Sequence, residues 1–106
     1  MNPSATGEEE TVEPTVRNAP ESDRYEIVDG DRVLGIAAYE RRGTTLVMTH
    51  TEVDPDTGHE GVGSALVRGA LDDVRAAGEK VVPRCPFVRG WIDRHPEYAD
   101  LVEKPE

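Results

Sequence analysis

Four residues, Gly61-Val62-Gly63-Ser64, stand where a turn passes into a helical pattern of apolar side chains. The first N–H groups of a helix have no partner within it and carry the positive end of its dipole, so such a turn can bind an anion. A nucleotide-phosphate loop and a dinucleotide fingerprint are both excluded, because Gly63 and Leu66 stand where a Lys and a third Gly are needed. A tight turn and helix cap without a ligand is the alternative.

A second candidate is Cys85, which precedes the helical pattern that starts at Pro86. Proline suits the first position of a helix, which places Cys85 at the N-cap. The positive end of that helix and the neighbouring Arg84 both favour the thiolate form. Because the chain has a single cysteine, an internal disulfide, a multi-cysteine metal site and a redox pair are excluded. A buried structural cysteine is the alternative.

Two titratable residues, His50 and Glu52, lie at the end of a predicted strand just before the glycine turn. Strand alternation puts them on one face and Thr51 on the other. They are candidates for a general base, with a purely structural histidine as the alternative. The three histidines show no close carboxylate–histidine spacing, so we predict no metal site.

The segment Arg94-His95-Pro96-Glu97-Tyr98 holds a further set of polar side chains. Arg94 and His95 could contact a phosphate, and Tyr98 could donate a proton to a leaving group. Each residue also has a simple explanation as a surface or packing residue.

The pattern predicts that the elements carrying these residues form an α/β fold. Three antiparallel strands are expected at residues 25–28, 33–39 and 44–53, with turns at residues 29–31 and 41–43. In the third strand, Leu46 and Met48 are expected on the same face as His50 and Glu52. The meander ends in the turn residues Asp54-Pro55-Asp56-Thr57-Gly58.

The second half of the chain changes to helical periodicity. A helix is predicted from Gly61 to about Ala77, with Gly78 just past its end. The short strand Val81-Val82-Pro83 should lie parallel to the third strand through a right-handed crossover. A second helix over residues 86–94 and a last turn over 97–102 follow. We therefore predict a sheet of about four strands with two helices.

Composition limits the class of protein. With 106 residues the chain is one domain. Residues 1–22 look like a disordered acidic tail, and residues 23–106 form the folded domain. The net charge of −10 argues against nucleic-acid binding. No apolar run approaches the roughly 20 residues of a membrane span, and the N-terminus lacks the order of a signal peptide. We expect a soluble cytoplasmic monomer.

Several segments, in this order along the chain, resemble the GNAT superfamily of N-acetyltransferases, in its minimal single-domain YjdJ-type branch. The resemblance covers roughly residues 24–102 and rests on five segments: His50-Thr51-Glu52-Val53, Gly61-Val62-Gly63-Ser64-Ala65-Leu66-Val67, Val81-Val82-Pro83, Arg84-Cys85-Pro86-Phe87-Val88 and Arg94-His95-Pro96-Glu97-Tyr98. It implies a minimal GNAT-like fold in which the third strand splays from the strand at 81–83, with acetyl-CoA between them and no metal.

The resemblance also implies a role for each matching residue. The pantetheine arm would bind backbone from Thr51 to Val53, and the pyrophosphate would lie on the amides of residues 61–64. The implied cofactor-binding residues are Thr51, Val53, Glu60, Gly61, Val62, Gly63, Ser64, Pro86 and Arg94. The implied catalytic residues near the thioester are Cys85, His50 and Glu52. Direct attack by the amine is preferred over transient acetylation of Cys85, because direct attack is the habit of the superfamily.

Two positions depart from the superfamily pattern. Gly58 stands where Arg or Gln is usual, and Glu60 puts a carboxylate beside the expected pyrophosphate. Like-charge repulsion predicts weakened coenzyme A binding. The expected function is acetyl-CoA-dependent N-acetyltransfer to a small or peptidyl primary amine. The alternative is a non-catalytic acyl-CoA-binding or protein-interaction module on the same fold.

Overall fold

We describe a computed structural model of the chain, for residues 14–55 and 61–103. Its strands are β1 (Thr15–Ala19), β2 (Arg24–Asp29), β3 (Arg32–Arg42), β4 (Thr45–Val53) and β5 (Lys80–Pro83). Its α-helices are α1 (Val62–Ala76) and α2 (Pro86–Arg94), and its 3₁₀ helices are η2 (Pro20–Ser22) and η4 (Pro96–Leu101). None of the described helices is long and apolar enough to cross a membrane.

The five strands form one sheet in the order β1-β2-β3-β4-β5. The first four pair antiparallel, and β5 pairs parallel to β4. The antiparallel meander, the crossover through α1 and the parallel fifth strand confirm the predicted α/β architecture. The turn after β2 and the end of α1 use Gly30 and Gly78, both with positive φ, as their positions in the sequence indicate.

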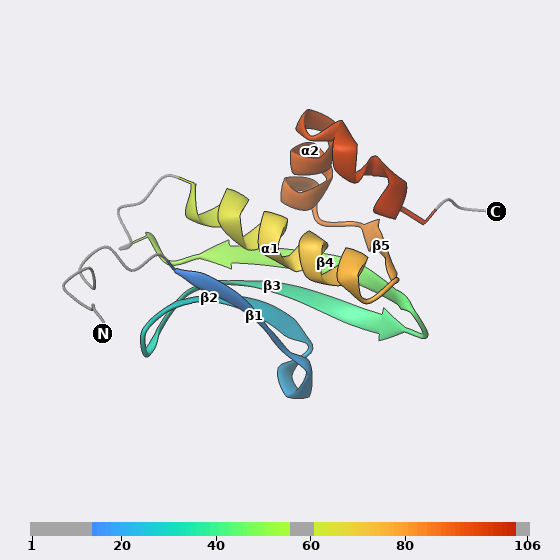
Figure 1. Cartoon of the computed structure of the whole chain (residues 1–106). Helices are drawn as coiled ribbons and strands as arrows, with labels where there is room; N and C mark the ends of the chain where they lie inside the picture. Colours follow the sequence, from blue (N-terminus) through green and yellow to red (C-terminus); the bar gives the residue numbers. More distant parts are fainter. Residues whose placement is uncertain (1–13, 56–60, 104–106) are drawn as a thin grey trace, which may run out of the picture.

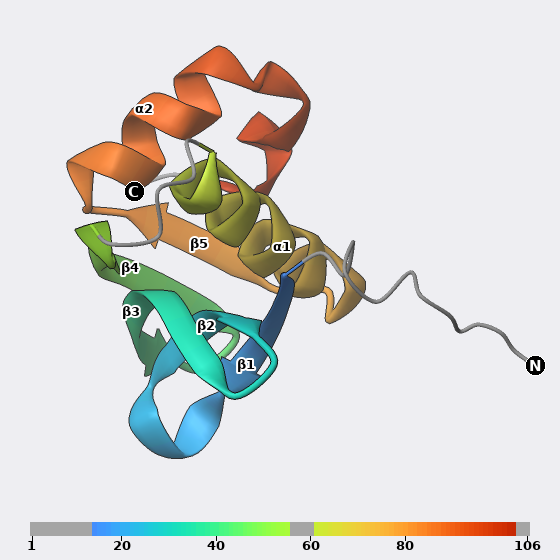
Figure 2. The same cartoon turned by 90° about the vertical axis from the view of Figure 1, so that its left-hand side faces the viewer.

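Both α-helices lie on the same side of the sheet, and among the described residues no α-helix covers the opposite face, which we call the helix-free face (Figures 1 and 2). The stripe of α1 that faces the sheet is fully apolar and comprises Val62, Leu66, Val67, Ala70, Leu71 and Val74. It packs with Leu46 and Met48 of β4 and with Trp91 of α2 in one core. This burial drives the packing of the layers, because apolar area removed from water is the main favourable term in folding.

The first strand corrects the predicted tail, because residues 15–22 belong to the fold. β1 pairs with β2 along its whole length, from Thr15 opposite Val28 to Ala19 opposite Arg24. On the helix-free face, Arg17 joins Arg24 in binding the buried carboxylate of Glu26. The folded domain therefore starts near residue 14 and not at residue 23. Residues 1–13 lie outside the described part of the chain.

The face assignment in β4 was also wrong. Ala38 pairs with His50 and Tyr39 with Met48, so Thr49 is an extra residue in β4. Such a bulge shifts the alternation of side chains by one position. Met48 is therefore in the core, whereas the side chains of His50 and Glu52 are 59% and 68% exposed.

The contact between β1 and α1 gives a prediction on stability. A Cβ atom on Gly69 of α1 would lie 2.6 Å from the Cβ of Val16. Gly69→Ala is therefore expected to destabilise the fold by about 1–2 kcal/mol, since overpacking outweighs the gain of an alanine inside a helix. In a Val16→Gly background, which removes the Cβ and both Cγ atoms of residue 16, the same change should stabilise by about 0.5 kcal/mol. Urea unfolding of the full chain, the two single variants and the double variant would measure both changes in the free energy of unfolding. Equal effects of the Gly69 change in the two backgrounds would contradict the contact.

Candidate functional site

The C-terminal half of β4 extends beyond its parallel partner. The pairing of β4 with β5 ends at Met48 opposite Pro83, and β4 continues to Val53. One further bond runs from the N–H of Cys85 to the carbonyl of Met48, at 2.9 Å. After that the chain turns into α2. Within the described chain, residues 49–53 of β4 thus pair with β3 alone, and the two strands separate as the sequence predicted.

Cys85 stands at this point of separation. It is the N-cap of α2, as predicted, and only 5% of its surface is exposed. Its Sγ lies 3.3 Å from the Oγ1 of Thr51, on the half of β4 that extends beyond β5. The predicted thiol and the predicted β4 segment are therefore in contact.

The surroundings of Cys85 favour the thiolate. Burial by itself raises the pKa of the thiol, because it removes water from the charged form. Hydrogen bonds from the Thr51 side chain and from the backbone N–H groups of Val88, Phe87 and Thr51 outweigh burial, so the pKa lies below its ordinary value. Two of these donors are N–H groups of the first turn of α2, which have no partner inside the helix.

The glycine turn begins α1 as predicted. Gly61 is the N-cap, with a φ of 90° that favours glycine, and no side chain caps the helix. The first intrahelical bond runs from the N–H of Ala65 to the carbonyl of Gly61, at 2.8 Å. The N–H groups of Val62, Gly63 and Ser64 therefore have no intrahelical partner. Although the chain has 22 acidic residues, none lies in the first turn of α1.

The N-termini of α1 and α2 meet at Phe87. A Cβ atom on Gly63 would lie 2.8 Å from the Cζ of Phe87 and 3.5 Å from the Cγ2 of Val53. Ser64 also contacts α2, because its Oγ accepts a 2.7 Å hydrogen bond from the indole N–H of Trp91. The free amides of α1 and the thiol of Cys85 thus lie at two adjacent helix N-termini, joined by an aromatic ring that is 42% exposed. Phe87 was predicted to lie in the second helix and in a segment of the family resemblance, but without a role in binding.

His50 and Glu52 lie on the other side of the sheet from Cys85. Thr51 reaches Cys85 on the helix side, so its two neighbours in the strand point to the helix-free face. The Nε2 of His50 lies 2.8 Å from the Oε2 of Glu52. The structure therefore keeps this pair together but does not place it beside the thiol.

The other predicted residues of α2 and η4 lie at separate positions along these two helices. Pro86 is the first residue of α2, and Arg94 is exposed at the C-terminal end of that helix. The ring of His95 stacks on Trp91 at 3.8 Å. Tyr98 is buried, and its hydroxyl donates to Asp72 at 2.8 Å, so it is held against α1. Burial first, and then that hydrogen bond, raise the pKa of Tyr98, which does not favour a role as proton donor. Glu60 lies outside the described residues.

A sequence model described as GCN5-related N-acetyl-transferase matches residues 24–101. The chain belongs to this family. Its members include N-acetyltransferases, which fits the site of two helix N-termini beside a strand that extends beyond its parallel partner. The predicted membership is confirmed at the level of the family, and the YjdJ-type branch stays a prediction. No curated protein matches the chain.

Solved structures show the same fold. A GCN5-like putative N-acetyltransferase from Staphylococcus aureus has a TM-score of 0.63 and 20% identity, over 86% of this chain and 89% of its own. The ribosomal-protein-S18-alanine N-acetyltransferase from Escherichia coli has a TM-score of 0.54 and 14% identity, over 68% of this chain and 50% of its own. A putative GNAT acetyltransferase from Desulfovibrio desulfuricans has a TM-score of 0.50 and 22% identity, over 68% of this chain and 52% of its own. The chain spans about half the length of the last two proteins.

Proposed function

We propose that this GCN5-related N-acetyltransferase transfers an acetyl group from acetyl-CoA to a primary amine. The observation that supports this most is the contact of two helix N-termini at Gly63 and Phe87. One N-terminus offers free amides to a pyrophosphate, and the other holds the thiol of Cys85. The segment of β4 from Thr51 to Val53, which has no partner strand on the β5 side, runs beside both, with Thr51 at Cys85 and Val53 at Gly63, and would bind the pantetheine arm.

The two faces of the sheet then supply different groups to the reaction. The Cys85 thiolate attacks the thioester carbon from the helix side, and the C–S bond to coenzyme A breaks as coenzyme A leaves as a thiolate, which takes up a proton from solvent. The acceptor ammonium first gives one proton to the His50–Glu52 pair; the neutral amine then attacks the carbonyl carbon of the acetylated Cys85 and releases its second proton to solvent. The amide forms, and the thiolate is released. The lowered pKa of the Cys85 thiol favours transient acetylation of Cys85 over the direct attack preferred from sequence.

Binding of acetyl-CoA is tested by thermal unfolding. At about 100 times the dissociation constant, acetyl-CoA is expected to add about 2.7 kcal/mol to the free energy of unfolding. Pantetheine, which lacks the pyrophosphate, should add less. Absence of any stabilisation by acetyl-CoA at millimolar concentration would reject the proposal. Release of coenzyme A with a panel of amines then distinguishes an enzyme from a binding module.

The pyrophosphate position is tested at Ala65, which is exposed in the first turn of α1. Ala65→Glu should weaken acetyl-CoA binding about tenfold at low salt through like-charge repulsion. The same carboxylate should not destabilise the free protein, because it lies at the positive end of the helix dipole. Ala65→Gln is the matched neutral control. Equal affinities of the two variants, measured by calorimetry, would place the pyrophosphate elsewhere.

A further inference from the structure

The arginines of the chain differ in whether a carboxylate binds them. Six of the ten form ion pairs with carboxylates, namely Arg17, Arg24, Arg32, Arg41, Arg42 and Arg75. The other four are exposed and form no ion pair with any described residue: Arg68, Arg84, Arg89 and Arg94. All four lie on α1, on α2 or just before α2. In a chain of net charge −10, the arginines that can bind an anion thus belong to the two helices of the candidate site.

Arg68 of α1 lies against two aromatic rings. Its Cζ is 5.3 Å from the centre of the Trp91 ring and 5.8 Å from that of Tyr98. One guanidinium nitrogen donates to the Tyr98 hydroxyl at 3.3 Å, and that hydroxyl donates to Asp72 at 2.8 Å. The rings hold the guanidinium in place through cation–π contacts, and only one of its five N–H donors is used. Arg68 is therefore a fixed cation with donors left for a ligand.

The position of Arg68 relates it to the glycine turn. It stands four residues after Ser64, so it lies on the same side of α1, one turn of about 5.4 Å further along. Long side chains of a helix lean toward its N-terminus, which brings the guanidinium back toward Ser64. Trp91 contacts both residues, because its indole N–H donates to the Ser64 Oγ at 2.7 Å while its ring carries Arg68. The free amides that begin α1 and the guanidinium of Arg68 are thus neighbours.

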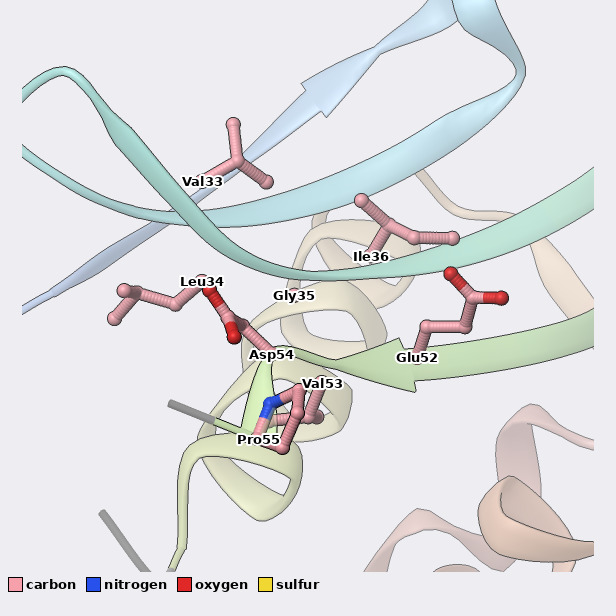
Figure 3. Close-up of a pocket in the computed structure, with 8 residues that line it drawn as sticks. All are labelled: Val33, Leu34, Gly35, Ile36, Glu52, Val53, Asp54 and Pro55. Carbon is pink, nitrogen blue, oxygen red and sulfur yellow. The ribbon is translucent and has the colours of Figure 1, made fainter. Parts of the chain in front are cut away.

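The two depressions found in the described surface do not suit an anion. One, of about 440 Å³, lies at the ends of β3 and β4 and is lined by the carboxylates of Glu52 and Asp54 and by no basic side chain (Figure 3). The other, of about 590 Å³, contains Lys80 together with the carboxylates of Asp100 and Glu103. Lys80 already donates to the carbonyl of Asp100 at 2.8 Å. An anion that extends beyond the glycine turn is therefore expected along α1.

We propose that Arg68 binds the 3′-phosphate of coenzyme A. The inference rests on the proposed function, which puts the pyrophosphate on the amides of residues 62–64. In coenzyme A the pyrophosphate and the 3′-phosphate are attached to the same ribose, so a cation one helical turn from the first can reach the second. The forked N–H donors of a guanidinium match the oxygens of a phosphate. Arg68 then distinguishes thioesters of coenzyme A from those whose pantetheine arm lacks the 3′-phosphate.

The test compares coenzyme A with 3′-dephospho-coenzyme A by calorimetry on the full chain at low salt. Coenzyme A is expected to bind about fivefold more tightly, which is the size of a good exposed ion pair. Arg68→Gln should lower the affinity for coenzyme A to that for the dephospho form and leave the latter unchanged, which also shows that the variant is folded. Arg68→Lys, which keeps the charge but not the fork, should retain part of the preference.

Arg42→Gln is the matched control, because it removes the same charge at the end of β3, opposite Thr45 and away from the site. It should change neither affinity. Three results would overturn the assignment: equal affinities of the full chain for the two ligands, an equal loss of both affinities in Arg68→Gln, or loss of the preference in Arg42→Gln. Failure of the proposed function has a different signature, because then neither ligand binds, and the 3′-phosphate site is rejected with it.

Discussion

A chain that begins at residue 23 is expected to lose about 3 kcal/mol or more of its free energy of unfolding. It lacks β1, whose Val16 packs on Gly69 of α1 and whose Ala19 is buried. Loss of the partly buried Val16 costs about 1–2 kcal/mol. Loss of the pair between Arg17 and Glu26 adds about 0.5–1 kcal/mol, because the Arg17 side chain is 60% exposed and Arg24 keeps Glu26 paired. Most domains have only about 5–15 kcal/mol of stability, so the shortened chain should be largely unfolded on mild heating.

The matched control is a chain that begins at residue 14, which keeps every described contact. Its free energy of unfolding should lie within about 0.5 kcal/mol of that of the full chain. Urea titrations of the three proteins, followed by Trp91 fluorescence, would measure the differences. If both shortened chains matched the full chain, β1 would contribute nothing to the fold, and the domain boundary predicted from sequence would stand.

The strand β1 shows why that boundary could not be predicted. Thr15–Ala19 contains two apolar residues among polar ones and has no clear alternation. Its stability comes from long-range contacts, with Gly69 of α1 on one face and Glu26 on the other. A pattern within a short window cannot contain such partners. By contrast, α1 and α2 were predicted to within two residues, because each carries its own apolar stripe, N-terminal signal and stop.

The candidate site was predicted in its parts but not in its arrangement. The N-cap position of Cys85 and the turn at Gly61 follow from local signals, namely Pro86 after the cysteine and paired glycines before a helix. The face on which His50 lies depends on the bulge at Thr49, which no local signal marks. One extra residue moved the predicted base to the face opposite the thiol, so the predicted catalytic groups do not lie side by side.

The largest expected effect on activity is at Cys85. After mixing with acetyl-CoA, the full chain is expected to gain one acetyl group in intact-mass spectra, and Cys85→Ala is expected to gain none. Turnover with an amine acceptor should fall about 100-fold or more in this variant, because the covalent route is lost. The side chain is small and already buried, so the variant should keep the fold. Binding of acetyl-CoA by calorimetry is the control that separates lost chemistry from lost affinity.

The contact of Thr51 with Cys85 makes the predicted acetylation of Cys85 dependent on pH. The hydroxyl of Thr51 helps to lower the pKa of Cys85, so Thr51→Val should raise that pKa, and Thr51→Ser should restore it. Since the thiolate is the nucleophile, the onset of acetylation should move to higher pH in Thr51→Val, and the rates should converge once the pH exceeds both pKa values. Ultraviolet thiolate absorbance would report the same shift directly, because the chain has a single cysteine. Full turnover by Cys85→Ala with an unchanged pH profile would instead assign the reaction to direct attack, with His50 and Glu52 alone removing the proton.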